Sequence, residues 1–225
     1  MTVIRCGAIL FDLDGVLMDS RVAVERAWER WAARHGIDPV AVLAEAHGRR
    51  TIDTIRAVAP LIDVEAEARL LEEAESVDFD GVTTLPGAAE LLRSLPSGSW
   101  TVVTSGTRAL ATGRLTHGGL PIPEHLITAD DIERGKPDPQ PYLAGAAALG
   151  VDPSDCLVIE DAPAGIDAGK TAGMTVLALV TTFDASALAG ADYVVGSLAD
   201  VALSSAEKLR DGRFALELAV GPRRE

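Results

Sequence analysis

The chain has 225 residues, of which 48% are hydrophobic and 24% charged, and its formal net charge is −14 at pH 7. This composition is typical of a globular protein with one large domain or two smaller ones, and it excludes the basic surface that nucleic acid requires. No apolar run reaches transmembrane length, and no basic segment precedes the first apolar run, so we expect neither a membrane partner nor a signal peptide. Cys6 and Cys156 fall in predicted buried strands, which favours reduced core thiols and a cytoplasmic protein.

In chain order, apolar runs predict strands at residues 3–11, 100–104, 125–128, 156–160, 174–180 and 193–195. The first of these is typical of a fully buried parallel strand. From residue 86 onward the strands alternate with predicted helices such as 87–95, 138–149 and 163–172. This alternation predicts an α/β fold, a Rossmann-like parallel sheet in a three-layer core. The alternating residues 213–220 predict a closing edge strand.

The segment between Gly15 and Leu85 shows helical periodicity only. One apolar helix face is formed by Val24, Ala27, Trp28 and Trp31. Gly36 ends this helix, Asp38-Pro39 begins the next, and further helices are predicted at 51–59 and 64–75. A helical stretch of this length is too long for a single crossover. We therefore expect a helical cap domain over residues 17–84, inserted between core segments 1–16 and 85–225.

Polar residues lie at the carboxyl ends of three of the predicted strands: Asp12 and Asp14, then Thr104-Ser105-Gly106, then Glu160-Asp161. Ligands of parallel sheets bind beyond the carboxyl ends of the strands, so these residues are expected to share one site. Gly15 would let the backbone turn sharply away from it.

These residue types indicate phosphate chemistry. The carboxylates are hard oxygen donors that suit Mg²⁺ better than zinc. The segment 104–106 offers a hydroxyl and backbone N–H groups to an anion, and Lys136 in a proline-flanked loop can balance the carboxylates. An Asp carboxylate can attack phosphorus and form an aspartyl-phosphate. Taken alone, however, Thr-Ser-Gly is often a plain turn, and a single lysine is more often solvated.

Four motifs resemble the signatures of the haloacid dehalogenase-like hydrolase superfamily over essentially the whole chain: DLDGV (12–16), VVTSG (102–106), GKPDP (135–139) and VIEDAPAGI (158–166). The resemblance implies that Asp12 is nucleophile and metal ligand. It implies that Asp14 is the acid–base residue, with its backbone carbonyl on the metal, and that Glu160 and Asp161 hold Mg²⁺. Thr104 would bind the phosphoryl group and Lys136 would bridge it to Asp12. Dehalogenase members lack the second aspartate, so Asp14 favours phosphate esters as substrates.

A narrower resemblance connects segments 47–60, 102–111, 127–143, 160–173 and 180–188 with the glycerol-phosphate and sugar-phosphate phosphatases of this superfamily. It implies that the cap contributes His47, Arg49 and Arg50 to the substrate site, with Ser105 and Gly106 on the core side. The match does not settle which of the three cap residues contacts the substrate, although Arg50 holds the motif's arginine position.

We therefore expect a Mg²⁺-dependent phosphatase, a monomer or weak dimer, for small phosphorylated sugars or polyols such as glycerol phosphate or hexose phosphate. A hexose-phosphate mutase of the same superfamily is the alternative, because both need the same intermediate. The family's mutases have a longer spacing between glycine and arginine than Gly48-Arg49-Arg50, which favours hydrolysis. A non-catalytic sensor of phosphorylated ligands is a third possibility, but it would lack a nucleophile, acid or metal ligand, and here none is missing.

Overall fold

The computed structural model describes residues 2–221 and is built around a six-stranded parallel sheet. The strand order is β6-β5-β2-β7-β8-β9, with bounds Leu126–Ile127, Trp100–Val103, Ala8–Phe11, Cys156–Glu160, Thr175–Leu179 and Tyr193–Val195. The first strand of this sheet in the chain, β2, lies between β5 and β7, so the strand order reverses beside it. The carboxyl ends of these three strands form the switch point at which doubly wound sheets bind ligands.

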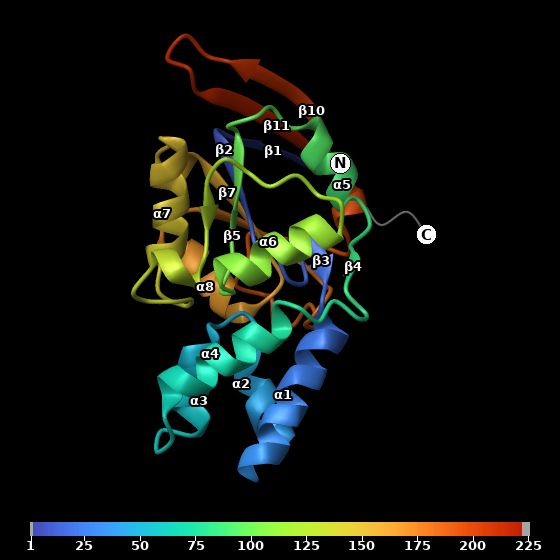
Figure 1. Ribbon diagram of the computed structural model, residues 1–225. Coiled ribbons are helices and arrows are strands. Elements are labelled where there is room, and N and C mark those ends of the chain that lie inside the picture. Colours follow the sequence, from blue (N-terminus) through green and yellow to red (C-terminus); the bar gives the residue numbers. More distant parts are fainter. Residues whose placement is uncertain (1, 222–225) are drawn as a thin grey trace.

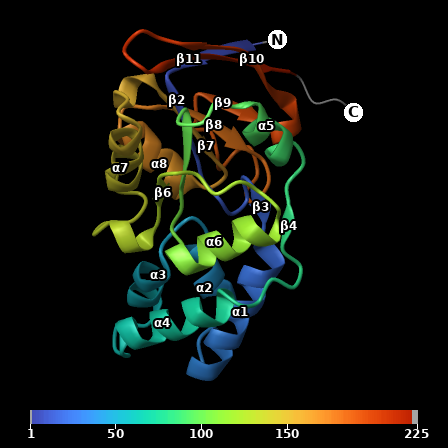
Figure 2. The ribbon, with the colours of Figure 1, turned by 45° about the horizontal axis from the view of Figure 1, so that its top comes forward.

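Helices cover both faces of this sheet, as the alternation of strands and helices predicts (Figures 1 and 2). On one face lie α7 (Gln140–Leu149) and α8 (Pro163–Thr171), and on the other α5 (Ala88–Ser94) and α6 (Arg108–His117). Short 3₁₀ turns at Ala129–Asp131, Pro153–Asp155 and Leu198–Asp200 complete the connections. The α/β fold class expected from the sequence is confirmed.

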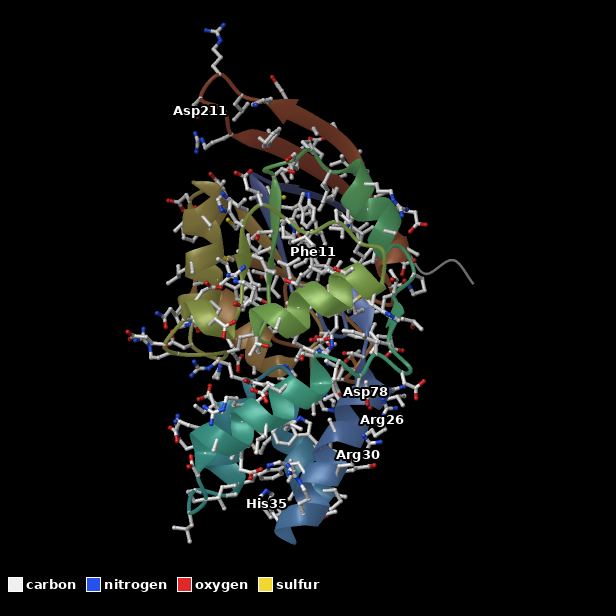
Figure 3. All side chains as sticks on the ribbon, viewed as in Figure 1. Phe11, Arg26, Arg30, His35, Asp78 and Asp211 are labelled. Atoms are coloured by element: carbon white, nitrogen blue, oxygen red, sulfur yellow. The ribbon has the colours of Figure 1, made fainter. Side chains whose placement is uncertain are left out.

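Alternate residues of the central strands separate the two hydrophobic cores, because successive side chains of a strand point to opposite faces. Phe11 and Ile159 are fully buried against the α5 and α6 side, and Phe11 lies deep within the side chains of Figure 3. Leu10 and Val158 are fully buried against the α7 and α8 side. Burial of each such side chain stabilises the fold by about 1.5–3 kcal/mol.

The first predicted strand, 3–11, is in fact two strands in two sheets. β1 (Thr2–Cys6) pairs antiparallel with β11 (Phe214–Val220), and only β2 belongs to the parallel sheet. The break falls at Gly7, whose N–H donates to the Asp155 carbonyl at 2.6 Å and where a side chain would crowd Val151.

The segment predicted as a closing edge strand is a strand, but it lies in the middle of a sheet. β11 lies between β1 and β10 (Val201–Lys208), in the order β1-β11-β10. This antiparallel sheet lies at the end of the molecule opposite α1–α4 (Figure 1). Its partner strand β10 was not predicted.

Four helices between β2 and β5 form a separate unit with its own core. They are α1 (Arg21–His35), α2 (Pro39–Ala46), α3 (Thr51–Val58) and α4 (Val64–Glu75). Gly36, at φ 66°, ends α1, and the Asp38 and Asp63 side chains cap α2 and α4. Trp28 and Trp31 pack edge to face with ring centroids 5.6 Å apart in the core of this four-helix unit. The helices predicted in this segment are therefore confirmed.

Two short strands connect the four-helix unit to the sheet domain, in a segment that the sequence predicted to contain only helices. β3 (Met18–Asp19) pairs antiparallel with β4 (Thr83–Thr84). Nearby, Arg26 of α1 donates to Asp78 at 2.8 Å, and the two residues lie together in Figure 3. The chain therefore leaves and re-enters the sheet domain at one place. Among the described helices, none combines the length and the apolar character needed to cross a membrane.

Candidate active site

The predicted polar residues at the strand ends come together in the structure. Asp12 directly follows β2, Thr104 directly follows β5, and Glu160 is the last residue of β7. Because β2, β5 and β7 are adjacent and parallel, their carboxyl ends lie at the same edge of the sheet. Carboxylate oxygens of Asp12, Glu160 and Asp161 lie within 4.8 Å of one another, and all three residues are buried.

Lys136 lies inside this cluster rather than in solvent. Its Nζ donates to Asp12 Oδ1 at 2.5 Å, to Glu160 Oε1 at 2.7 Å and to the Val103 carbonyl at 3.2 Å. Burial would lower the pKa of Lys136, but the two carboxylates outweigh it and raise the pKa well above its ordinary value. The ammonium therefore stays charged and fixes one oxygen of Asp12.

Four donors occupy the Glu160 carboxylate. Oε1 accepts from Lys136 and from the Tyr142 hydroxyl at 2.8 Å, and Oε2 accepts from the backbone N–H groups of Asp161 and Ala162 at 2.8 and 3.0 Å. Burial alone would raise the pKa of Glu160, but Lys136 and these hydrogen bonds lower it. A side chain at Gly165 would overlap the carboxylate, so this glycine makes room for it. Glu160 therefore fixes Lys136 and the 160–162 backbone.

Lys136 balances only part of the negative charge that Asp12, Glu160 and Asp161 carry when ionised. Burial raises the pKa of Asp12 to about 7 against the pull of Lys136, and burial with Glu160 raises the pKa of Asp161 well above its usual range. Three buried carboxylates thus share one lysine. A hard divalent cation would balance this cluster, and its oxygen donors match the preference of such ions. Asp12 and Asp161 both line the adjoining cavity, which leaves them better placed than Glu160 to coordinate a metal.

Thr104, Ser105 and Gly106 border the same cavity. The Thr104 hydroxyl oxygen accepts from the Gly106 N–H at 3.1 Å, which leaves the hydroxyl hydrogen for an anion. The Ser105 hydroxyl donates to the Gly48 carbonyl at 3.0 Å, so this loop also contacts the four-helix unit.

Asp14 also lines the cavity, and it has two partners that the sequence did not indicate. Its Oδ1 accepts from the Ser20 hydroxyl at 2.6 Å and pairs with Arg114 Nη1 at 2.6 Å. Arg114 belongs to α6, far from the motifs, and is itself buried.

The four-helix unit contributes His47 and Arg49 to the cavity lining, but the structure places Arg50 elsewhere. The Arg50 guanidinium donates to both carboxylate oxygens of Asp53, at 2.7 and 3.1 Å, and to the Ile132 carbonyl at 3.3 Å. It therefore joins the start of α3 to the 132–135 loop. This position corrects the expectation that Arg50 belongs to the substrate site together with His47 and Arg49.

His47 and Gly48 pack directly on the sheet domain. The His47 ring meets the edge of Phe183 at a centroid distance of 6.0 Å, and burial lowers the pKa of His47. A side chain at Gly48, where φ is 79°, would overlap Ala162. The resulting cavity of about 180 Å³ is bounded by both parts of the chain, which suits a small polar ligand.

A doubly wound sheet with acidic residues, a buried lysine and a hydroxyl-bearing loop at its switch point is the arrangement of an α/β enzyme. The chain belongs to the haloacid dehalogenase-like hydrolase family, because the sequence pattern of that family matches residues 6–173.

Individual relatives agree with this assignment. The chain is 44% identical over 205 residues to hexitol phosphatase A of Escherichia coli, covering 89% of this chain and 95% of the relative. It is 36% identical over 226 residues to glycerol-1-phosphate phosphohydrolase 2 of Saccharomyces cerevisiae, covering 95% and 88%. The crystal structure of a hydrolase from Pseudomonas syringae superposes with a TM-score of 0.74 at 29% identity, covering 86% and 94%. The protein is therefore an enzyme of the phosphatase class.

Proposed function

We propose that this protein is a Mg²⁺-dependent phosphatase that releases phosphate from small phosphorylated sugars or polyols through an aspartyl-phosphate on Asp12. The observation that carries the proposal is that Asp12, paired with the buried Lys136, lines a cavity bounded by both parts of the chain. The substrate class follows from the relatives, one a hexitol phosphatase and the other a glycerol-1-phosphate phosphohydrolase. We also propose that it acts in the cytoplasm, where its free cysteines would stay reduced.

In this proposal the metal is held by the side chains of Asp12 and Asp161 and by the backbone carbonyl of Asp14. Glu160 supports the site through Lys136 and through the backbone N–H of Asp161. When bound, the cation neutralises charge on the phosphoryl oxygens and on the carboxylates around them.

In the first step, a carboxylate oxygen of Asp12 attacks phosphorus while the bond from phosphorus to the substrate oxygen breaks. Asp14 in its acid form donates its proton to the departing alkoxide, so the alcohol leaves neutral. Lys136 holds Asp12 and offsets negative charge at the phosphoryl group, and the Thr104 hydroxyl donates to a phosphoryl oxygen during the transfer.

In the second step, the Asp14 carboxylate removes a proton from water as the water oxygen attacks phosphorus. The bond between phosphorus and Asp12 breaks, inorganic phosphate forms, and both aspartates return to their starting states. Asp14 thus regains in the second step the proton that it donates in the first.

We further propose that residues 17–84 act as a cap that selects the leaving alcohol. His47 and Arg49 line the cavity opposite the carboxylates, and their donors can recognise hydroxyl groups of a sugar or polyol. The contact of Ser105 with Gly48 and the packing of His47 on Phe183 support a closed arrangement that excludes bulk water.

The test is phosphate release from a panel of hexitol, hexose and glycerol phosphates with Mg²⁺. We expect turnover by the wild type and none by Asp12→Asn, which keeps the shape of the site but removes the nucleophile. Interconversion of hexose-phosphate isomers without phosphate release would instead indicate a mutase. Unchanged turnover by Asp12→Asn would reject the mechanism.

A further inference from the structure

Arg114 is a buried arginine whose position packing does not explain. It lies on the buried face of α6 with Leu110, Ala111 and Leu115, and only 2% of its surface is exposed. A guanidinium in such a place is costly unless its charge is paired. Its two partners lie far apart in sequence: Nη1 is 2.6 Å from Asp14 Oδ1, and Nη2 is 3.4 Å from Glu75 Oε1.

The contact with Asp14 constrains its carboxylate. Both Ser20 and Arg114 bind the same oxygen, Oδ1, and no side-chain partner is found for Oδ2 within residues 2–221. A hydrogen bond from Ser20 and an ion pair with Arg114 on this one oxygen restrict rotation of the carboxylate, and Asp14 lines the cavity. Oδ2 is thereby available to carry the proton that the reaction needs, while Oδ1 is held.

The contact with Glu75 connects Arg114 to the four-helix unit. Glu75 is the last residue of α4, is buried, and lines the same cavity as Asp14 and Arg114. The guanidinium therefore bridges a carboxylate of the sheet domain and a carboxylate of the proposed cap. A shift of α4 would alter the bridge and, with it, the orientation of Asp14.

We propose that Arg114 is a positioning residue that orients Asp14 for proton transfer and that Glu75 holds Arg114 in place from α4. This inference rests on the proposed phosphatase function, in which Asp14 serves as acid and then as base. Arg114 does not touch the reacting atoms in this scheme. Its effect passes entirely through Asp14.

A double-mutant cycle tests this dependence. Arg114→Gln should lower kcat on a hexitol or glycerol phosphate by about 10²-fold, up to the loss seen in Asp14→Asn. KM should change by less than about threefold, since the substrate contacts remain. In the Asp14→Asn background, Arg114→Gln should cause no further loss. Losses that multiply would show that Arg114 acts independently of Asp14 and would overturn the proposal.

Pre-steady-state kinetics with p-nitrophenyl phosphate give a readout that a general loss of stability would not produce. Its leaving group needs no proton, so the first step should survive in Arg114→Gln while the second step slows. We expect a burst of about one p-nitrophenol per active site, followed by slow turnover. A uniform slowing without a burst would contradict the role assigned to Arg114.

Three further variants complete the experiment. Arg114→Lys keeps the charge but cannot bridge both carboxylates as a fork, so we expect a partial loss. Arg108→Gln, an exposed arginine on the same helix, should leave kcat unchanged. If Arg114→Gln does not fold, Glu75→Gln replaces it, with an expected three- to tenfold fall in kcat that disappears in Asp14→Asn. Wild type without any phosphate release would reject the proposed function, whereas active wild type with fully active Arg114→Gln would reject only the role of Arg114.

Discussion

Tyr142 is a buried residue that contacts Glu160 and Lys136 but does not line the cavity. Its hydroxyl donates to Glu160 Oε1 at 2.8 Å, and its ring lies 4.9 Å from the Lys136 ammonium. Glu160 keeps three other donors when this hydroxyl is removed. We therefore expect Tyr142→Phe to lower the free energy of unfolding by about 1–2 kcal/mol and kcat only severalfold.

Chemical denaturation measures the loss of stability, and phosphate release measures the change in kcat. The matched control is Tyr193→Phe, because Tyr193 is the other tyrosine of the chain and lies in β9 on the α5 and α6 side of the sheet. That variant should change stability by less than about 0.5 kcal/mol. Equal effects of the two variants would remove any special role for Tyr142.

Arg49 and Arg50 are neighbours in sequence with different surroundings, so their variants should differ in kind. Arg49 lines the cavity and has one exposed ion pair, with Glu45 at 3.0 Å. Arg49→Ala should raise KM for a sugar or polyol phosphate roughly tenfold, with little change in KM for p-nitrophenyl phosphate.

Arg50→Ala should instead lower the melting temperature, because Asp53 and the Ile132 carbonyl lose the donors of Arg50. Steady-state kinetics and thermal denaturation separate the two; a larger KM effect from Arg50→Ala would contradict this assignment.

The residues found from the sequence and those missed differ in one respect. Asp12, Thr104, Lys136 and Asp161 lie in contiguous motifs at strand ends or in a loop with two prolines, so local pattern predicts where they meet. Arg114 and Glu75 meet across 39 residues and belong to different parts of the chain. No motif marks them, although Arg114 follows Leu110 and Ala111 at the spacing of one helix face, which is a signal for a buried charge.

Within the four-helix unit, Glu67 joins α4 to α1. Its carboxylate accepts from Trp31 Nε1 at 3.1 Å and lies 2.9 Å from His35 Nε2. The hydrogen bond with His35, together with the charges around it, holds the pKa of Glu67 below its usual 4.5. A carboxylate with a lowered pKa in the folded state stabilises the fold above its unfolded pKa, and this contribution disappears as the pH falls through the lower folded value.

We therefore expect Glu67→Gln to reduce the free energy of unfolding by about 0.5–1 kcal/mol at pH 7, since the site is partly screened by solvent. The difference from wild type should shrink below pH 4.5 and vanish in stronger acid. Denaturation curves between pH 3 and 8 test this. Glu65→Gln, on the same helix turn but largely exposed, is the control. A difference that persists unchanged at low pH would exclude the carboxylate as its source.

At the scale of elements, the parallel sheet and the helices of the insert were predictable, and the antiparallel sheet was not. The central parallel strands are short and mostly apolar runs, because both of their faces are covered. β10 is mostly exposed, so its sequence carries no burial signal. The division of residues 2–11 at Gly7 depends on which strand lies beside each half, and that is decided by tertiary contacts.

For the molecule as a whole, binding of a divalent cation should change stability as well as activity. Three buried carboxylates with one lysine repel one another, and a bound cation would relieve that repulsion. Mg²⁺ at about 100 times its dissociation constant should stabilise the fold by about 2.7 kcal/mol, or roughly 5–10 °C in melting temperature. EDTA should abolish turnover, because it removes the divalent cation. Ca²⁺ should bind but inhibit, because its coordination shell is larger and more flexible than that of Mg²⁺.

Thermal denaturation with and without Mg²⁺ measures this effect independently of catalysis. Asp161→Asn should lose the increase in melting temperature. Asp211→Asn should retain it, because Asp211 lies in the turn between β10 and β11 at the far end of the molecule (Figure 3). Full activity in metal-free protein, verified by elemental analysis, would contradict the proposed metal dependence.

The pairing of β3 with β4 has a consequence for how this enzyme can be rebuilt. Met18 lies opposite Thr84 and Asp19 opposite Thr83, so the two ends of the four-helix insert are already side by side. Closing that gap with a short turn, or with a different helical module, would need no rearrangement of the parallel strands, and the entropy of closing a loop depends only weakly on its length. A single pair of cuts could therefore place a new specificity module on the hydrolytic scaffold, provided that the module replaces the contacts that Ser20 makes with Asp14 and Glu75 with Arg114.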